Sequence, residues 1–152
     1  MAIAISLHLL GTIIWVGGMF FAYVILRPVA AELLEPPDRL ALWNRTFQRF
    51  FIWVWTAVLI LPTTGYWIIF QVYGGMDNVG LHIHVMQGLG ILMILLYLHL
   101  YFAPYRRLQR AVDARDYESA GKYLNQIRTI VGINLALGLI VVVVATAGQI
   151  LY

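Results

Sequence analysis

The chain has 152 residues, of which 62% are hydrophobic and 11% are charged, and its mean hydropathy is +0.82. This composition excludes a soluble globular domain and indicates an integral membrane protein. The absence of cysteine excludes disulfides, thiolate catalysis and iron–sulfur clusters, so a metal or cofactor needs histidine, methionine, carboxylate or backbone ligands. The formal charge of +3 does not indicate nucleic acid, because the basic residues lie between apolar stretches, and we expect no nucleic-acid partner.

Four apolar stretches without a charged residue are long enough to cross a bilayer as helices, which takes about 20 residues. We predict an all-α protein, an integral membrane four-helix bundle that forms one domain over residues 1–152. The predicted spans are 2–26, 51–73, 79–103 and 129–150. Backbone polar groups in lipid must bond within their own segment, so only helices suit such stretches.

All ten Lys and Arg residues lie in the connections that follow the first and third spans. Cytoplasmic loops are enriched in basic residues, so this pattern predicts that both connections are inside. We expect a multi-pass protein of a bacterial-type inner (cytoplasmic) membrane. Both termini and the Gly74-Gly75 turn are then predicted to be outside (N-out and C-out). The short turn makes the second and third helices antiparallel neighbours.

The basic connections carry helix signals of their own. Asp38 and Asp116 are predicted N-caps of the second and fourth helices, and the third helix is predicted to continue past Pro104. The bundle therefore has helical cytoplasmic extensions. Within the second span, Pro62 removes a backbone donor and predicts a kink.

Histidines inside membrane-spanning sequence are costly and point to function. His8 and His84 each lie roughly five residues from the predicted outer ends of their spans, so both are about 8 Å deep at a rise of 1.5 Å per residue. His8 shares a helix face with Trp15, and His84 shares one with Gln87 and Gly88; we expect both faces to line the bundle core. The arrangement predicts haem b near the outer face, with both histidines as iron ligands and electron transfer as the activity.

Copper is the alternative, because thioethers together with imidazoles select Cu(I). The candidate copper ligands cluster near the same predicted outer face and are His82, His84, Met76 and Met86. On a helix, His82 and His84 point about 200° apart, so they share an ion only if the segment starts as a non-helical turn. His99 lies some 15 residues beyond His84 and has no histidine partner at its depth.

A third hypothesis is a small structural or assembly subunit of a larger membrane complex, in which the histidines are incidental. The lipid bilayer is an expected partner under every hypothesis. A haem protein also requires a redox partner, which the sequence does not identify. A homo-oligomer and a haem-dependent oxidoreductase activity are both left open.

Four short motifs carry a family resemblance: Leu7-His8-Leu9-Leu10-Gly11, Trp15-Val16-Gly17-Gly18, Leu26-Arg27-Pro28 and Tyr105-Arg106-Arg107-Leu108. Through them the chain resembles the copper-resistance D (CopD) domain superfamily over nearly all four spans. It is also similar to the related HemJ-type protoporphyrinogen oxidases, which are four-helix haem b proteins. In that comparison His8 corresponds to their helix-one histidine, and Leu81-His82-Ile83-His84 corresponds to their Leu-His-x-Lys. The resemblance implies a haem- or copper-linked membrane protein.

Overall fold

Four long helices make up the computed structural model, which describes residues 1–151 and, within them, every side chain except those of residues 149 and 151. Each helix is long and apolar enough to cross a membrane, which confirms the predicted all-α membrane bundle. The elements in chain order are α1 (Ala2–Phe20), η1 (Phe21–Leu26), α2 (Arg27–Leu33), α3 (Pro36–Ile68), η2 (Ile69–Tyr73), η3 (Met76–Asn78), α4 (Leu81–Leu100), η4 (Tyr101–Tyr105), α5 (Arg106–Asp113) and α6 (Tyr117–Leu151).

The segments η1 and η4 are π-helical and continue the helices on either side of them, and the π-helical segment η2 extends α3 as far as Tyr73. The first membrane helix therefore runs without a break over Ala2–Leu33, which is 32 residues. At a rise of 1.5 Å per residue it is about 48 Å long, whereas the hydrocarbon core of a bilayer is about 30 Å thick. The third helix likewise continues past Pro104 to Asp113, as the sequence predicts. The helices thus extend beyond the apolar core of the membrane.

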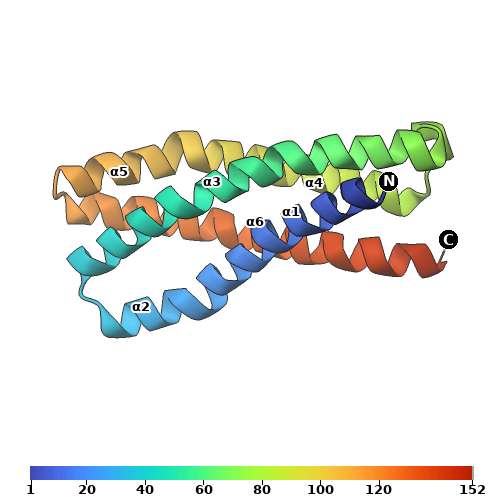
Figure 1. The fold of residues 1–152 in the computed structure, drawn as a ribbon. Coiled ribbons are helices and arrows are strands. Elements are labelled where there is room, and N and C mark those ends of the chain that lie inside the picture. Colours follow the sequence, from blue (N-terminus) through green and yellow to red (C-terminus); the bar gives the residue numbers. More distant parts are fainter. Residues whose placement is uncertain (152) are drawn as a thin grey trace.

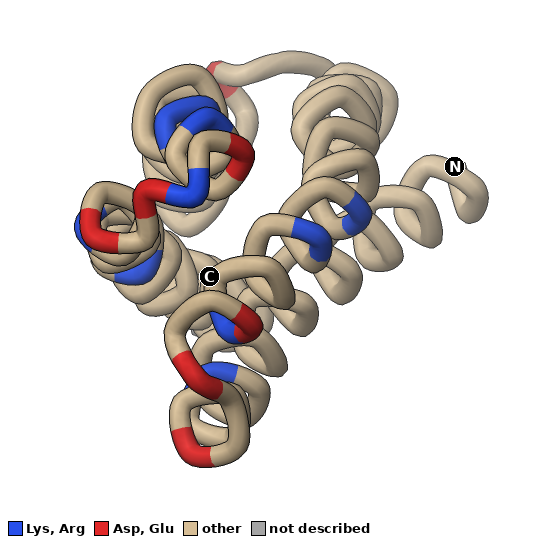
Figure 2. Tube along the Cα trace, turned by 90° about the vertical axis from the view of Figure 1, so that its left-hand side faces the viewer, with Lys and Arg blue, Asp and Glu red and all other residues tan. Residues whose placement is uncertain are grey.

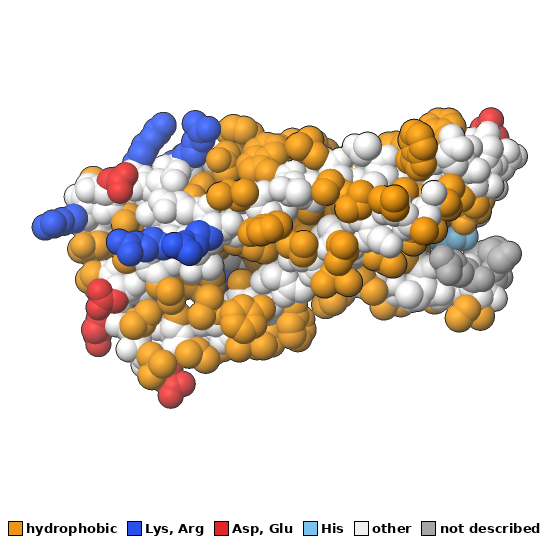
Figure 3. Space-filling view, viewed as in Figure 1, with side chains coloured by type: hydrophobic (Ala, Val, Ile, Leu, Met, Phe, Trp, Pro, Cys, Tyr) orange, Lys and Arg blue, Asp and Glu red, His pale blue; other side chains and the backbone are white. Residues whose placement is uncertain are grey.

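The two termini lie at the same end of the bundle as the connection between η2 and α4 (Figure 1). We call this the termini end. The connection turns sharply at Gly74 and Gly75, whose φ angles of 74° and 136° favour glycine. The basic residues gather at the opposite end, which faces the viewer in Figure 2 and lies on the left in Figure 3. We call this the basic end.

The helices pack as two close pairs, α1 with α3 and α4 with α6. Small residues bring the pairs together near the middle of the bundle. A Cβ atom added to Gly138 of α6 would lie 2.9 Å from Val16 of α1 and 3.2 Å from Met93 of α4. Three of the membrane helices therefore meet at this glycine.

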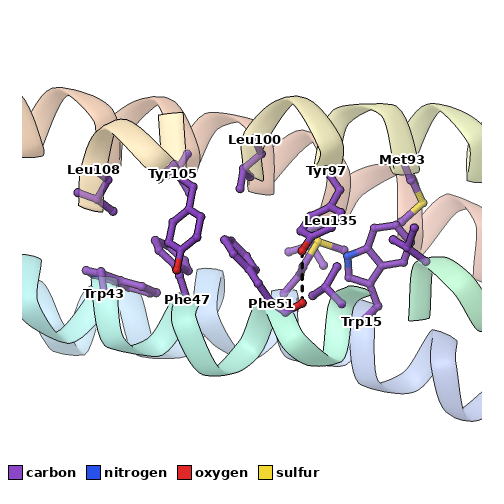
Figure 4. Packing of buried hydrophobic residues seen from close by; sticks show 14 of the residues in the cluster. Trp15, Trp43, Phe47, Phe51, Met93, Tyr97, Leu100, Tyr105, Leu108 and Leu135 are labelled. Atoms are coloured by element: carbon purple, nitrogen blue, oxygen red, sulfur yellow. Dashed lines mark hydrogen bonds between the residues drawn. The ribbon is translucent and has the colours of Figure 1, made fainter. Parts of the chain in front are cut away.

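Aromatic side chains fill the space between α3 and the third membrane helix (Figure 4). The ring centroid of Phe51 lies 5.1 Å from that of Phe47, 5.5 Å from that of Tyr97 and 4.8 Å from that of Tyr105. The Tyr97 hydroxyl also donates a hydrogen bond to the Phe51 carbonyl oxygen at 3.3 Å. Phe51 is 4% exposed, and bulky rings of this kind set the spacing between the helices.

The outward faces of the helices are apolar as well, as the orange surface between the two ends shows in Figure 3. Ile13 of α1, Trp53 of α3 and Leu95 of α4 are all more than half exposed. An apolar surface of this extent is suited to lipid and not to water. The fold therefore places the protein in a bilayer.

One predicted helix start is confirmed and the other is wrong. The backbone N–H of Ser119 donates to the Asp116 carboxylate at 3.1 Å, which confirms Asp116 as the N-cap of α6. Asp38 is not a cap. The second helix begins at Pro36, three residues earlier than an Asp38 cap would give, because proline fixes a helical φ and lacks the N–H that a first-turn residue leaves unpaired.

Proline also lies inside α3, which stays helical through Pro62 as far as Ile68. The hydroxyl of Thr63 donates to the Leu59 carbonyl at 2.7 Å, and that of Thr64 donates to the Ile60 carbonyl at 2.6 Å. Threonine hydroxyls next to a proline supply hydrogen bonds to helix carbonyls within lipid.

The Asp116 cap gives a pH-dependent prediction. Hydrogen bonds from the Ser119 side chain and backbone lower the pKa of the Asp116 carboxyl below its ordinary value. The cap therefore stabilises the fold fully above about pH 4, the ordinary aspartate pKa, and this contribution is lost as the pH falls through the lowered pKa. We expect Asp116→Ala to lower the melting temperature at pH 7 and to match the wild type at pH 2. Asp116→Asn, which keeps a capping oxygen, is the control and should melt near the wild-type temperature at pH 7.

Candidate functional site

His8 of α1 is hydrogen-bonded to the neighbouring helix. Its Nδ1 lies 2.9 Å from Oγ1 of Thr64, a buried residue of α3. The Thr64 hydroxyl has one proton and gives it to the Ile60 carbonyl, so it accepts from the imidazole. We therefore assign the His8 proton to Nδ1, which leaves the lone pair of Nε2 available to a ligand. The sequence analysis considered this part of the second span only for the kink at Pro62 and so missed the contact between His8 and Thr64.

His82 lies at the start of α4 and packs against α6. A Cβ atom added to Gly148 of α6 would lie 2.4 Å from the His82 Cβ and 2.6 Å from its Cγ. The glycine thus gives the imidazole its place between the helices. His82 Nδ1 is buried and has no hydrogen-bond partner among the described atoms. A buried polar atom without a partner is rare and calls for an explanation.

His84 is exposed, unlike His82. Its helix face includes Gly88, which is also exposed, and Ile91, which is 49% exposed. The expectation that this face lines the bundle core is therefore wrong. Gln87, which shares the face with His84, is half-buried and donates a hydrogen bond to the Tyr66 hydroxyl of α3.

Helix α4 begins at Leu81, so His82 and His84 are both helical. They point in different directions, and the condition for sharing one ion, a non-helical start, is not met. Met86 is four residues after His82, lies on the same helix face and is half-buried like it. Because both residues are helical, the four-residue spacing puts an imidazole and a thioether on one face of α4, a relation that the sequence analysis did not assign.

The remaining candidates lie apart from this pair. Met76 is half-buried in the short helical turn η3, ahead of α4. Trp15 is 3% exposed and packs edge-on against Tyr97, with ring centroids 6.2 Å apart, within the aromatic core. His99 is exposed near the middle of the third membrane helix.

The histidines fall into a simple arrangement along the bundle. Three of the four, His8, His82 and His84, are within about two turns of the termini end, where Figure 3 also shows a histidine at the surface. Among the described residues no three His, Cys, Asp or Glu side chains come together as a metal site. A closed tetrahedral zinc site of the structural kind requires four such ligands, and the described residues do not form one.

Comparison with known proteins gives one match. Neither the curated proteins nor the solved structures contain a significant match to the chain. The model of the family described as copper resistance protein D matches residues 44–147. The match covers three of the four membrane helices and includes His82, His84 and Met86. The resemblance to HemJ-type oxidases stays a prediction, whereas the chain belongs to the copper resistance protein D family.

Proposed function

We propose that the protein is a copper-handling membrane protein that binds Cu(I) as cargo at its termini end, through His82 and Met86 of α4. The observation that carries the proposal is the buried Nδ1 of His82, which has no hydrogen-bond partner among the described atoms. Met86 follows His82 by four residues, on the same face of α4. A metal ion would satisfy this nitrogen. The family match supports copper over haem, which was the first interpretation of the sequence.

The ligand types point to the reduced ion. A thioether and an imidazole are the soft and borderline ligands that Cu(I) accepts at low coordination number, and no cysteine is present to compete. Cargo also has to leave its site. Two neutral ligands hold the ion less tightly than a thiolate cluster and carry no charge that would have to be buried with it.

Copper binding by purified protein under reducing conditions tests this proposal. We expect the wild type to bind Cu(I), and we expect His82→Ala and Met86→Leu each to weaken binding at least about tenfold, because even residues that only support a ligand change metal affinity by about 10–100-fold. His99→Ala is the matched control, since His99 lies on the same membrane helix but away from the termini end. Equal affinity in wild type, His82→Ala and Met86→Leu would contradict the proposal.

Haem b bound through His8 and His84, with electron transfer to a redox partner, is the second candidate. It is favoured by the His8 hydrogen bond to Thr64, which orients the imidazole and leaves Nε2 available, as in metal-ligating histidines generally. The exposure of His84 argues against an iron shared within one chain. Optical spectra of the oxidised and reduced protein distinguish the candidates, because a haem protein has a Soret band that His8→Ala removes. A folded protein with neither haem nor copper would favour the third hypothesis, a subunit of a larger complex.

The proposed orientation places the termini end outside and the basic end in the cytoplasm of a bacterial-type cell. It is supported by the gathering of all ten Lys and Arg residues toward the basic end, since basic loops remain inside. A reporter that is active only outside the inner membrane should therefore work when fused after the last residue. Activity there of a strictly cytoplasmic reporter instead would reverse the orientation.

A further inference from the structure

A half-open cavity of about 370 Å³ lies at the basic end, between α6 and the hairpin that α2 forms with α3. In Figure 1 the α2 segment diverges from α6 on this side. The walls are largely apolar and include Leu40 and Trp43 of α3 and Ile127 of α6. Three arginines from three different elements also line the cavity: Arg27, Arg39 and Arg128.

Two of these arginines differ from the other basic residues. Arg27 and Arg39 are half-buried, whereas the other eight Lys and Arg side chains of the described chain are exposed. The Arg27 guanidinium lies 4.5 Å from the centroid of the Tyr23 ring, a cation–π contact that holds it at the cavity. The rule that basic residues stay in the cytoplasm explains why Arg27 and Arg39 lie at this end, but it does not explain why their side chains are half-buried.

The cavity has positive charge without a counter-charge from the protein. None of the three arginines forms an ion pair with a carboxylate in the part of the chain that the structure describes, where the recorded pair joins Lys122 to Glu118 at 3.4 Å. No acidic residue lines the cavity. Half-buried guanidinium groups are best satisfied by an anion that accepts several hydrogen bonds, and phosphate matches their geometry.

The occupant also has to match the apolar walls and the depth in the membrane. The cavity lies near the ends of helices that exceed the hydrocarbon thickness, so we expect it at the level of the lipid headgroups. A free phosphate would leave the partly exposed side chains of Leu124 and Val131, which also line the cavity, without an apolar group to cover them. We propose that this cavity binds an anionic phospholipid, with the phosphate on Arg27, Arg39 and Arg128 and the first part of the acyl chains against the apolar walls. The site is separate from the copper ligands, which lie at the other end of the bundle.

Native mass spectrometry of detergent-purified protein, titrated with phosphatidylglycerol or phosphatidylcholine, tests this site. We expect the wild type to bind phosphatidylglycerol at about tenfold lower concentration than phosphatidylcholine, because the lipids differ in net charge and share the phosphate and chains. Equal binding of the two lipids would overturn the proposal without any variant. Inorganic phosphate at millimolar concentration should not displace the phospholipid, and complete displacement would instead identify a soluble phosphate ligand.

A pair of charge-matched double variants locates the site. Arg27→Gln with Arg39→Gln should abolish the preference for phosphatidylglycerol. Arg45→Gln with Arg49→Gln removes the same charge from exposed positions of α3 outside the cavity and should leave the preference unchanged. If both double variants lost the preference for phosphatidylglycerol equally, the lipid would be attracted by the basic surface in general, and the proposal that the cavity is the site would be overturned.

Discussion

Replacing Phe51 with alanine is expected to lower the free energy of unfolding by about 3 kcal/mol, since truncating a buried aromatic side chain costs about 3–5 kcal/mol in soluble cores. We expect the low end of this range because lipid is as apolar as the protein core. Truncation in a membrane protein therefore costs mainly packing contacts and little hydrophobic free energy. Phe51 contacts aromatic rings from its own helix and from the third membrane helix, so its removal opens a cavity where the two meet.

The control for this variant is Trp53→Ala on the same helix. Trp53 is 56% exposed on the lipid-facing surface, so its truncation leaves no cavity and should change the free energy of unfolding by less than about 0.5 kcal/mol. Equilibrium unfolding of both variants in detergent measures the difference. Equal destabilisation by the two variants would show that the aromatic cluster is not what holds the helices together.

Gly148→Ala is expected to weaken both the fold and copper binding. The new Cβ would lie 2.4 Å from the His82 Cβ, an atom that moves only with the backbone of α4, so the two helices must separate. Overpacking of this kind costs about 1–3 kcal/mol. His82 would be displaced with its helix, and we expect the affinity for Cu(I) to fall at least about tenfold. Thermal unfolding and copper titration of the same preparation measure the two effects.

Gly121→Ala is the matched control, because Gly121 lies on the same helix and has open space around the position of a Cβ. Alanine is the better helix former by about 1 kcal/mol, so this variant should be as stable as the wild type or more so. It should bind copper normally. If Gly148→Ala behaved in the same way, the close approach of α4 and α6 at His82 would be refuted.

The helices could be predicted because lipid permits few other structures for long uncharged stretches. Their orientation about their own axes could not. In a soluble helix the polar face identifies the side turned to water, but here lipid and core are both apolar, and α4 carries hydrophobic residues all round. The prediction therefore turned His84 inward, whereas the structure exposes it and half-buries His82.

Contacts between helices were equally inaccessible from the sequence. The bond between His8 and Thr64 depends on how far α1 slides along α3, which is set by packing of side chains 56 residues apart in the chain. The position of His82 depends in the same way on Gly148 of α6. What the sequence does contain is the set of candidate ligands, because few ionisable or thioether side chains occur at the termini end.

The two close pairs join helices that follow one another in the chain, the first with the second and the third with the fourth. A short connection joins the two helices of each pair. The entropic cost of bringing them together is therefore low, and their contacts join residues close in sequence. The first hairpin can therefore assemble in the membrane while the ribosome is still making the second. Docking of the finished hairpins through the aromatic rings is then the late step of biogenesis, and substitutions among those rings should slow maturation more than membrane insertion.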